Sequence, residues 1–149
     1  MKRIGLVLLC LAVLCLLAGC DREGTENVNS KTSDVTAAVT VRNGVTEADV
    51  WLLPDTAENR STSLWGTATA AKVKTEERRK AALPEPGDDG RYLLRMIDTD
   101  GMYYSADGLT LANGWQIEIR EVDIMRVTAT VTDQNGAVQS VYDVFSAHL

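Results

Sequence analysis

The sequence Val127-Thr128-Ala129-Thr130-Val131-Thr132-Asp133-Gln134-Asn135-Gly136 decides the fold class. Its first six residues alternate between apolar and polar side chains, which is the period of two that a half-buried β-strand requires. The Asn135-Gly136 pair then predicts a β-hairpin with a type I′ turn, because both central residues of that turn have positive φ. The return strand, residues 137–146, is apolar on both faces, so we expect it to lie inside the fold. One face carries Val138, Tyr142 and Val144, and the other carries Val141 and Phe145.

The same alternation recurs in the chain before this hairpin. Trp115, Ile117 and Ile119 alternate with polar residues, and this is the clearest strand pattern of the sequence. Residues 72–83 have the composition of a helix but no apolar stripe at helical spacing, so a strand is the favoured interpretation. Further strands are predicted at residues 39–42, 48–53, 91–97, 102–104 and 109–111. We therefore predict an all-β domain over residues 37–149, an antiparallel β-sandwich, immunoglobulin-like or prealbumin-like, of seven or eight strands.

The first twenty residues differ from the rest of the chain. Lys2 and Arg3 form a basic start, and residues 4–17 are almost unbroken Leu, Val, Ala and Cys. About fourteen apolar residues are too few for a helix across a bilayer core of about 30 Å, so residues 1–19 are predicted to be a cleaved signal peptide. Residues 21–36 are polar and nearly free of large apolar side chains, so we expect a flexible tether there.

The residues Leu17-Ala18-Gly19-Cys20 resemble the lipobox of bacterial lipoproteins. The resemblance implies that the Cys20 thiol receives a diacylglycerol and that cleavage after Gly19 makes Cys20 the new N-terminus. Two acyl chains hold a protein on a membrane where a single chain binds only marginally. The expected location is therefore the extracytoplasmic face of the cell membrane, with the N-terminal lipid as the membrane contact.

Charge and composition exclude several function classes. Removal of Lys2 and Arg3 with the leader leaves 13 of the 15 basic residues against 21 acidic ones, a net charge of −8, so we expect no nucleic-acid partner. All three cysteines lie at or before Cys20, which leaves the mature chain without a cysteine pair. His148 is the one histidine, so no Ser/His/Asp or Cys/His arrangement can form. We predict that the protein is not an enzyme; a small hydrolase is the alternative.

Asp98-Thr99-Asp100-Gly101 resembles the start of a calcium loop. Alternate carboxylates before a glycine bring hard oxygen ligands toward one Ca²⁺ ion, and Asp107 is a further candidate ligand. No distal acid at calcium-loop spacing follows, however, because Met102 and two tyrosines come next. A hairpin turn that uses Asp and Gly for their tolerance of positive φ is the favoured interpretation, and no cofactor is expected apart from this Ca²⁺ alternative.

Aromatic and basic residues suggest two further sites. Trp65 and Tyr103 are candidates for stacking against a ligand such as a glycan, although a half-buried loop anchor is the favoured role of Trp65, and Trp115 is expected in the core. The basic residues of segment 72–80 suit anionic headgroups or teichoic polymer. An exposed edge strand protected by its charges explains the same segment, and we favour that interpretation.

Four stretches of the chain, taken in order, resemble a recurrent secreted β-domain of bacteria: 41–43, 49–54, 64–66 and 91–104. The resemblance covers about residues 38–120 and implies a β-sandwich without catalytic residues. Together with the leader, it predicts a membrane-anchored extracytoplasmic lipoprotein that acts as a non-catalytic binding or envelope-assembly module. The expected partner is an envelope protein or a glycan, and the alternative is a carbohydrate- or calcium-binding cell-surface domain.

Overall fold

The computed structural model describes residues 35–87, 89–123 and 126–148. The predicted signal peptide, Gly19, Cys20 and the tether up to residue 34 lie outside these described residues. The described chain forms the strands β1 (Thr36–Val41), β2 (Glu47–Pro54), β3 (Ala70–Lys74), β4 (Arg78–Ala82), β5 (Tyr92–Asp98), β6 (Met102–Leu109), β7 (Gln116–Asp123), β8 (Arg126–Thr132) and β9 (Val138–His148), and the short helix α2 (Ala57–Ser61).

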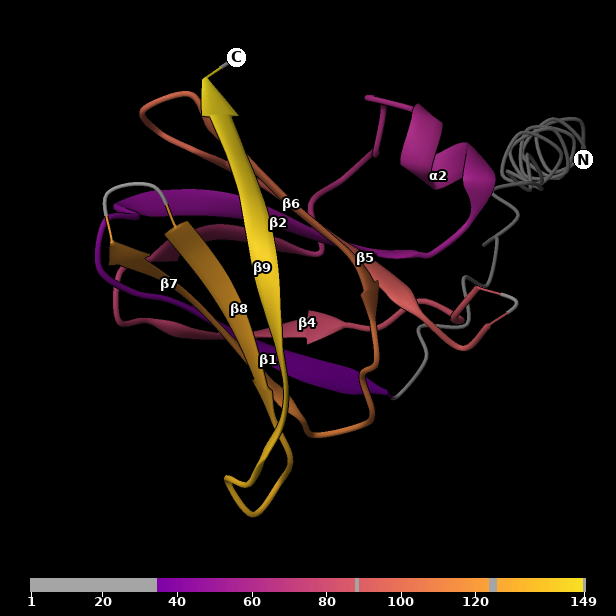
Figure 1. The fold of residues 1–149 in the computed structure, drawn as a ribbon. Helices are drawn as coiled ribbons and strands as arrows, with labels where there is room; N and C mark the ends of the chain where they lie inside the picture. The colour runs from indigo at the N-terminus through magenta and orange to yellow at the C-terminus, as the bar shows by residue number, and fades with distance from the viewer. Residues whose placement is uncertain (1–34, 88, 124–125, 149) are drawn as a thin grey trace, which may run out of the picture. The chain divides into compact units, whose positions relative to one another are not determined.

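The nine strands form one continuous sheet in the order β3-β2-β5-β6-β9-β8-β7-β1-β4, nearly closed into a barrel (Figure 1). All neighbouring strands pair antiparallel except β1 and β7, which are parallel. The predicted all-β class is therefore confirmed. The strands number nine rather than seven or eight, and a single sheet that curls toward closure does not confirm the predicted sandwich.

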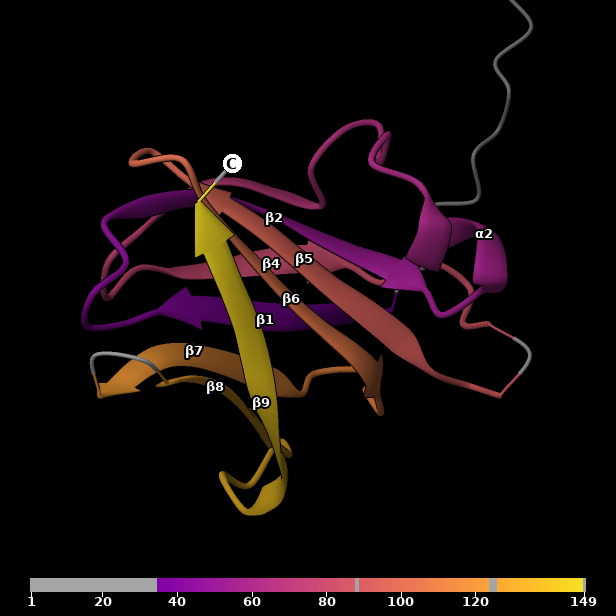
Figure 2. The same cartoon turned by 45° about the horizontal axis from the view of Figure 1, so that its top comes forward.

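β9 lies at the middle of the sheet. Its N-terminal half pairs with β8, and its C-terminal end pairs with β6. Both views show β9 crossing from one half of the sheet to the other (Figures 1 and 2). The expectation that this strand lies inside the fold is correct for its place in the sheet and wrong for the burial of three of its apolar residues, because Val138, Val141 and Phe145 are 61%, 57% and 64% exposed.

The core fills the space that the curled sheet encloses. The inward faces of the strands carry side chains such as Val39, Leu52, Met96 and Ile117, all of them at most 1% exposed. The predicted alternation places these residues correctly, because residues two apart on a strand share a face. Trp115 packs partly buried against this core, as predicted.

The hairpin between β8 and β9 is where predicted, but its turn is not type I′. Only Gly136 of the turn has positive φ (82°), whereas a type I′ turn needs two such residues. The Asp133 carboxylate explains the difference, because its Oδ1 accepts hydrogen bonds from the backbone N–H groups of Asn135 and Ala137 at 2.8 and 3.0 Å. This side chain stabilises a turn in which Asn135 keeps negative φ.

The segment 72–83 belongs to the two strands at the ends of the sheet, β3 and β4. A turn at residues 75–77 joins them, and the Thr75 N–H donates to the Thr46 carbonyl oxygen at 2.8 Å. Strand is thus correct and helix wrong, although the chain makes two short strands instead of one. Glu76 has a φ of 65° in this turn. The favoured interpretation of a charged edge is confirmed, since both strands have one unpaired side.

Two other local predictions differ from the structure. The sequence predicts a separate strand at residues 109–111, but in the structure Leu109 is the last residue of β6 and residues 110–111 are not in a strand. The helix α2 was not predicted; Thr56 caps it, its Oγ1 accepting from the Asn59 N–H at 3.2 Å, and the helix is only five residues long. Among the residues that the structure describes, no helix has the length and hydropathy that a membrane span needs.

Candidate binding surface

The outward face of β2, β5 and β6 holds the predicted binding residues. The strand register places Trp51 of β2 opposite Arg95 of β5, and Arg95 opposite Ser105 of β6. One step along the strands on the same face, Ile97 lies between Asp49 and Tyr103. Side chains of neighbouring strands on one face are in contact distance, so these two rows form one surface.

Trp65 lies on this surface and contacts aromatic rings of two strands. Its ring stacks on that of Tyr103 with centroids 5.7 Å apart and an interplanar angle of 18°. It also meets Trp51 edge to face, at 5.4 Å and 61°. The indole N–H groups are satisfied by backbone carbonyl oxygens, Trp65 by Thr62 at 2.8 Å and Trp51 by Gly66 at 3.1 Å. The structure thus brings the predicted pair Trp65 and Tyr103 together and adds Trp51; half-buried Trp65 anchors the loop after α2, as favoured.

A buried arginine lies in the strand between these aromatic residues. The Arg95 side chain is 5% exposed although it lies on the outer face of β5. Its Nη1 donates to the carbonyl oxygens of Leu94 and Ala106 at 2.9 and 3.3 Å and to Asp107 Oδ1 at 2.7 Å. The register of β5 and β6 shifts between Tyr92 and Leu94, next to Arg95, and the guanidinium binds the carbonyls of the register pair that borders this irregularity, Leu94 and Ala106. Sequence reasoning missed Arg95; a lone charge within Tyr92-Leu93-Leu94-Arg95-Met96-Ile97 was the available signal.

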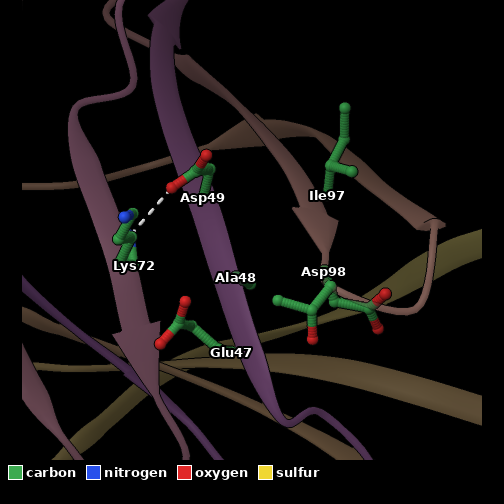
Figure 3. Close-up of a pocket in the computed structure, with 7 residues that line it drawn as sticks. Glu47, Ala48, Asp49, Lys72, Ile97 and Asp98 are labelled. Atoms are coloured by element: carbon green, nitrogen blue, oxygen red, sulfur yellow. Dashed lines mark hydrogen bonds between the residues drawn. The ribbon is translucent and has the colours of Figure 1, made fainter.

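A pocket of about 240 Å³ lies over β2 and β5, and Ile97 is one of its lining residues. Figure 3 shows Glu47 and Asp49 on β2, with Ile97 and Asp98 on the neighbouring β5. The backbone N–H of Lys72 donates to Asp49 Oδ1 at 2.8 Å and fixes that carboxylate. Because Tyr103 is the register partner of Ile97, the pocket and the aromatic rings share one surface. The two carboxylates offer hydrogen-bond acceptors beside apolar ring faces.

The aromatic surface continues onto β9. Phe145 is the register partner of Ser105, and Ala147 that of Tyr103, so Phe145 lies diagonal to Tyr103 on the same face. The Phe145 side chain is 64% exposed. Leu64, next to Trp65 in the covering loop, is 87% exposed. We call the outward surface formed by Trp51, Trp65, Tyr103 and Phe145 the aromatic face.

The three predicted calcium ligands have separate roles. Asp98 is buried; its Oδ1 accepts from the N–H groups of Asp100 and Met102 at 3.0 and 2.9 Å, and its Oδ2 from the Tyr104 hydroxyl at 2.9 Å. Burial, together with this hydrogen bond to Asp98, raises the pKa of Tyr104 well above its usual range. Asp100 is exposed in the turn, whereas Asp107 binds Arg95 near the other end of the hairpin.

This arrangement fits the turn that was favoured over the calcium loop. Within residues 35–87, 89–123 and 126–148, no three His, Cys, Asp or Glu side chains are grouped so that they could hold a metal ion. What the aromatic face can do chemically is to stack against a ligand and accept hydrogen bonds from it. Comparison of the chain with family models, with curated proteins and with solved structures finds no match.

Proposed function

We propose that the protein is a membrane-anchored extracytoplasmic lipoprotein whose β-domain is a non-catalytic binding module, with the aromatic face as its binding surface. The exposure of Phe145 beside the half-buried aromatic rings carries this proposal. A large apolar side chain kept in water at the middle of a sheet forgoes the free energy that burial would provide. Contiguous exposed apolar groups of this kind mark interaction sites.

A glycan is the ligand class that suits this surface best. The C–H faces of a pyranose ring pack on aromatic rings, and its hydroxyl groups need acceptors nearby. Glu47 and Asp49 supply carboxylates in the pocket, where Ile97 lies between Asp49 and Tyr103, and Ser105 supplies a hydroxyl beside Phe145. This alternation of rings and small polar groups favours a carbohydrate over a flat protein contact, whose centre is depleted in charged residues.

The membrane anchor is proposed from the lipobox residues Leu17-Ala18-Gly19-Cys20. Mass spectrometry of the protein from its native host tests it directly. We expect an N-terminal peptide that starts at Cys20 and carries a diacylglyceryl group, and we expect a Cys20→Ser variant to lose both the modification and the membrane fraction. An unmodified Cys20 in the native protein would refute the anchor and leave the binding surface to be judged on its own test.

A glycan array tests the binding surface. The full chain in detergent micelles is applied to bacterial envelope polysaccharides and peptidoglycan fragments. Phe145→Ala is compared with Val122→Ala, which removes another apolar side chain that is more than half exposed, from β7. We expect Phe145→Ala to weaken binding about tenfold, since a central aromatic contact contributes more than about 1 kcal/mol. Val122→Ala should bind as the wild type does, and both variants should keep its melting temperature.

The outcomes of this experiment are distinct. If the wild-type chain binds no glycan on the array, the carbohydrate ligand is wrong. If both variants lose binding equally, or if Phe145→Ala binds normally, the aromatic face is not the binding surface. Trp65→Ala is unsuitable as the main probe, because Trp65 also packs the covering loop on the sheet and its loss would change stability and binding together.

A further inference from the structure

We infer that a groove between β1 and β4 binds the headgroups of anionic lipids and orients the domain on the membrane that holds its anchor. This inference rests on the proposed function, because it takes Cys20 to be lipidated. The groove has a volume of about 400 Å³. Its lining residues are Thr36, Ala37, Ala38, Arg78, Lys80 and Gly114.

The groove combines a floor of small residues with a basic wall. Arg78 and Lys80 lie two residues apart on β4 and therefore on the same face. In the strand register they are opposite Thr40 and Ala38 of β1, whose short side chains leave room between the two cations and the sheet. A phosphate that enters this space meets an ammonium and a guanidinium from one side, which is the arrangement that anionic groups bind best.

The acidic residues around this wall already have partners. Glu76 forms an ion pair with Arg42, and Glu77 Oε1 is 2.7 Å from Arg79 Nε. Glu118, opposite Thr40 on the other side of β1, binds Arg42 at 3.0 Å. Arg78 and Lys80 are both exposed, and no ion pair is recorded for either of them within the described ranges. The groove thus keeps a local positive charge on a domain whose overall charge is negative.

The position of the groove in the chain points to the membrane as the source of the phosphate. Thr36 lines the groove and begins β1, about sixteen residues after Cys20. A flexible segment of that length has a root-mean-square span of about 20 Å and a fully extended reach of about 55 Å. With Cys20 lipidated, a segment of this length would keep lipid headgroups within reach of the groove and raise their effective concentration.

The net charge of the domain makes the contact directional. Anionic lipids repel most of an acidic surface and attract the basic groove. Each basic residue near the headgroups raises the affinity for the membrane roughly fivefold. In the sheet order, β8 and β7 separate β1 from β9. The groove shares no lining residue with the aromatic face, so docking of the groove uses none of the residues of that face. Pairing of another strand with β4 is the less favoured use of this edge, because its charges oppose sheet extension.

Energy transfer from tryptophan to a dansyl-labelled lipid tests the inference. The full chain is reconstituted into vesicles of phosphatidylcholine alone or with about one third phosphatidylglycerol, and the same sample is checked for acylation of Cys20 by mass spectrometry. The double variant Arg78→Glu/Lys80→Glu is compared with Arg91→Glu/Arg126→Glu, which makes the same change of charge at two exposed positions elsewhere. We expect transfer to be at least twofold higher with phosphatidylglycerol for the wild type and the control, and to fall to the phosphatidylcholine level for the groove variant.

Three other outcomes overturn the inference, and a fourth separates the failure of the anchor from that of the groove. Equal transfer in both kinds of vesicle means that the groove does not bind anionic lipid. Equal loss in both double variants means that overall charge, and not the groove, is responsible. If a soluble polyglycerol phosphate binds the wild type but not the groove variant while vesicle composition has no effect, the partner is an anionic polymer. If Cys20 is unmodified, the anchor fails; co-sedimentation of the same chains with the two kinds of vesicle then still decides whether the groove binds lipid.

Discussion

Replacing Asp98 with alanine removes the acceptor of three hydrogen bonds at the turn between β5 and β6. Two of the donors are the N–H groups of Asp100 and Met102, and the third is the buried hydroxyl of Tyr104. A hydrogen bond to a charged group contributes about 1.5–3 kcal/mol, and a buried hydroxyl without a partner costs about 1–3 kcal/mol. These contributions overlap, so we expect Asp98→Ala to lower the free energy of unfolding by about 3 kcal/mol, and the melting temperature by about 10–15 °C.

Two comparisons make this prediction specific. Asp98→Asn keeps an oxygen for both N–H groups, while its amide donates to the Tyr104 oxygen, so we expect a loss of only about 1 kcal/mol. Asp100→Ala changes an exposed residue of the same turn and should alter stability by less than about 0.5 kcal/mol. Thermal unfolding followed by circular dichroism, with and without EDTA, measures all three. The reasoning is refuted if Asp98→Ala melts like the wild type, or if EDTA destabilises the wild type and Asp98→Asn abolishes that effect, which would restore the calcium site.

Three further predictions use the same unfolding assay. Arg95→Ala should cost about 2–4 kcal/mol, because it removes the Nη1 hydrogen bonds to the carbonyls of the irregular β5–β6 ladder and to Asp107; a loss below 1 kcal/mol would contradict that role. The hydrogen bond from Arg60 lowers the pKa of Asp55, so this pair stabilises the fold above about pH 4, and its contribution is lost as pH falls through the lowered pKa. Asp55→Asn should therefore remove that part of the acid sensitivity. If the melting temperature of Asp55→Asn depends on pH as that of the wild type does, the pair has no such role. Gly87→Ala should destabilise by about 1–3 kcal/mol, since its Cβ would lie 2.4 Å from the Asp55 carbonyl oxygen, and a neutral result would mean that the backbone there shifts freely.

The strands were predictable because burial of one face of a strand produces an alternation of apolar and polar residues that can be read from the strand's own sequence. Ile117 and Ile119 face the core and their polar neighbours do not, so the period of two identifies the strand without knowledge of its partners. The same holds for the turn at Asp98, whose Asp and Gly residues were correctly interpreted as turn residues. Turn type is less well determined by such signals. Asn135-Gly136 indicates a type I′ turn, but hydrogen bonds to the Asp133 carboxylate stabilise a different turn.

The aromatic face and the closure of the sheet depend on contacts between distant residues. Trp65 and Tyr103 could be proposed separately as candidate ligand contacts, but their stacking requires the loop after α2 to fold back over β5. Nothing local in the sequence encodes that path. The burial of Arg95 likewise depends on residues distant in the sequence, because its guanidinium binds Ala106 and Asp107 of β6. The segment 72–83 was divided into two strands by a turn that the tertiary hydrogen bond between Thr75 and Thr46 stabilises.

The central place of β9 makes folding of the whole sheet depend on this strand. β9 is the last of the nine described strands along the chain, yet both β6 and β8 depend on it for their second partner. Until residues 138–148 are available to fold, the two halves of the sheet have no common strand and the core between them stays open to solvent. The domain therefore assembles cooperatively only once β9 is present, and a nonsense codon near position 138 would yield a product with two unpaired sheet edges, which favours proteolysis and aggregation.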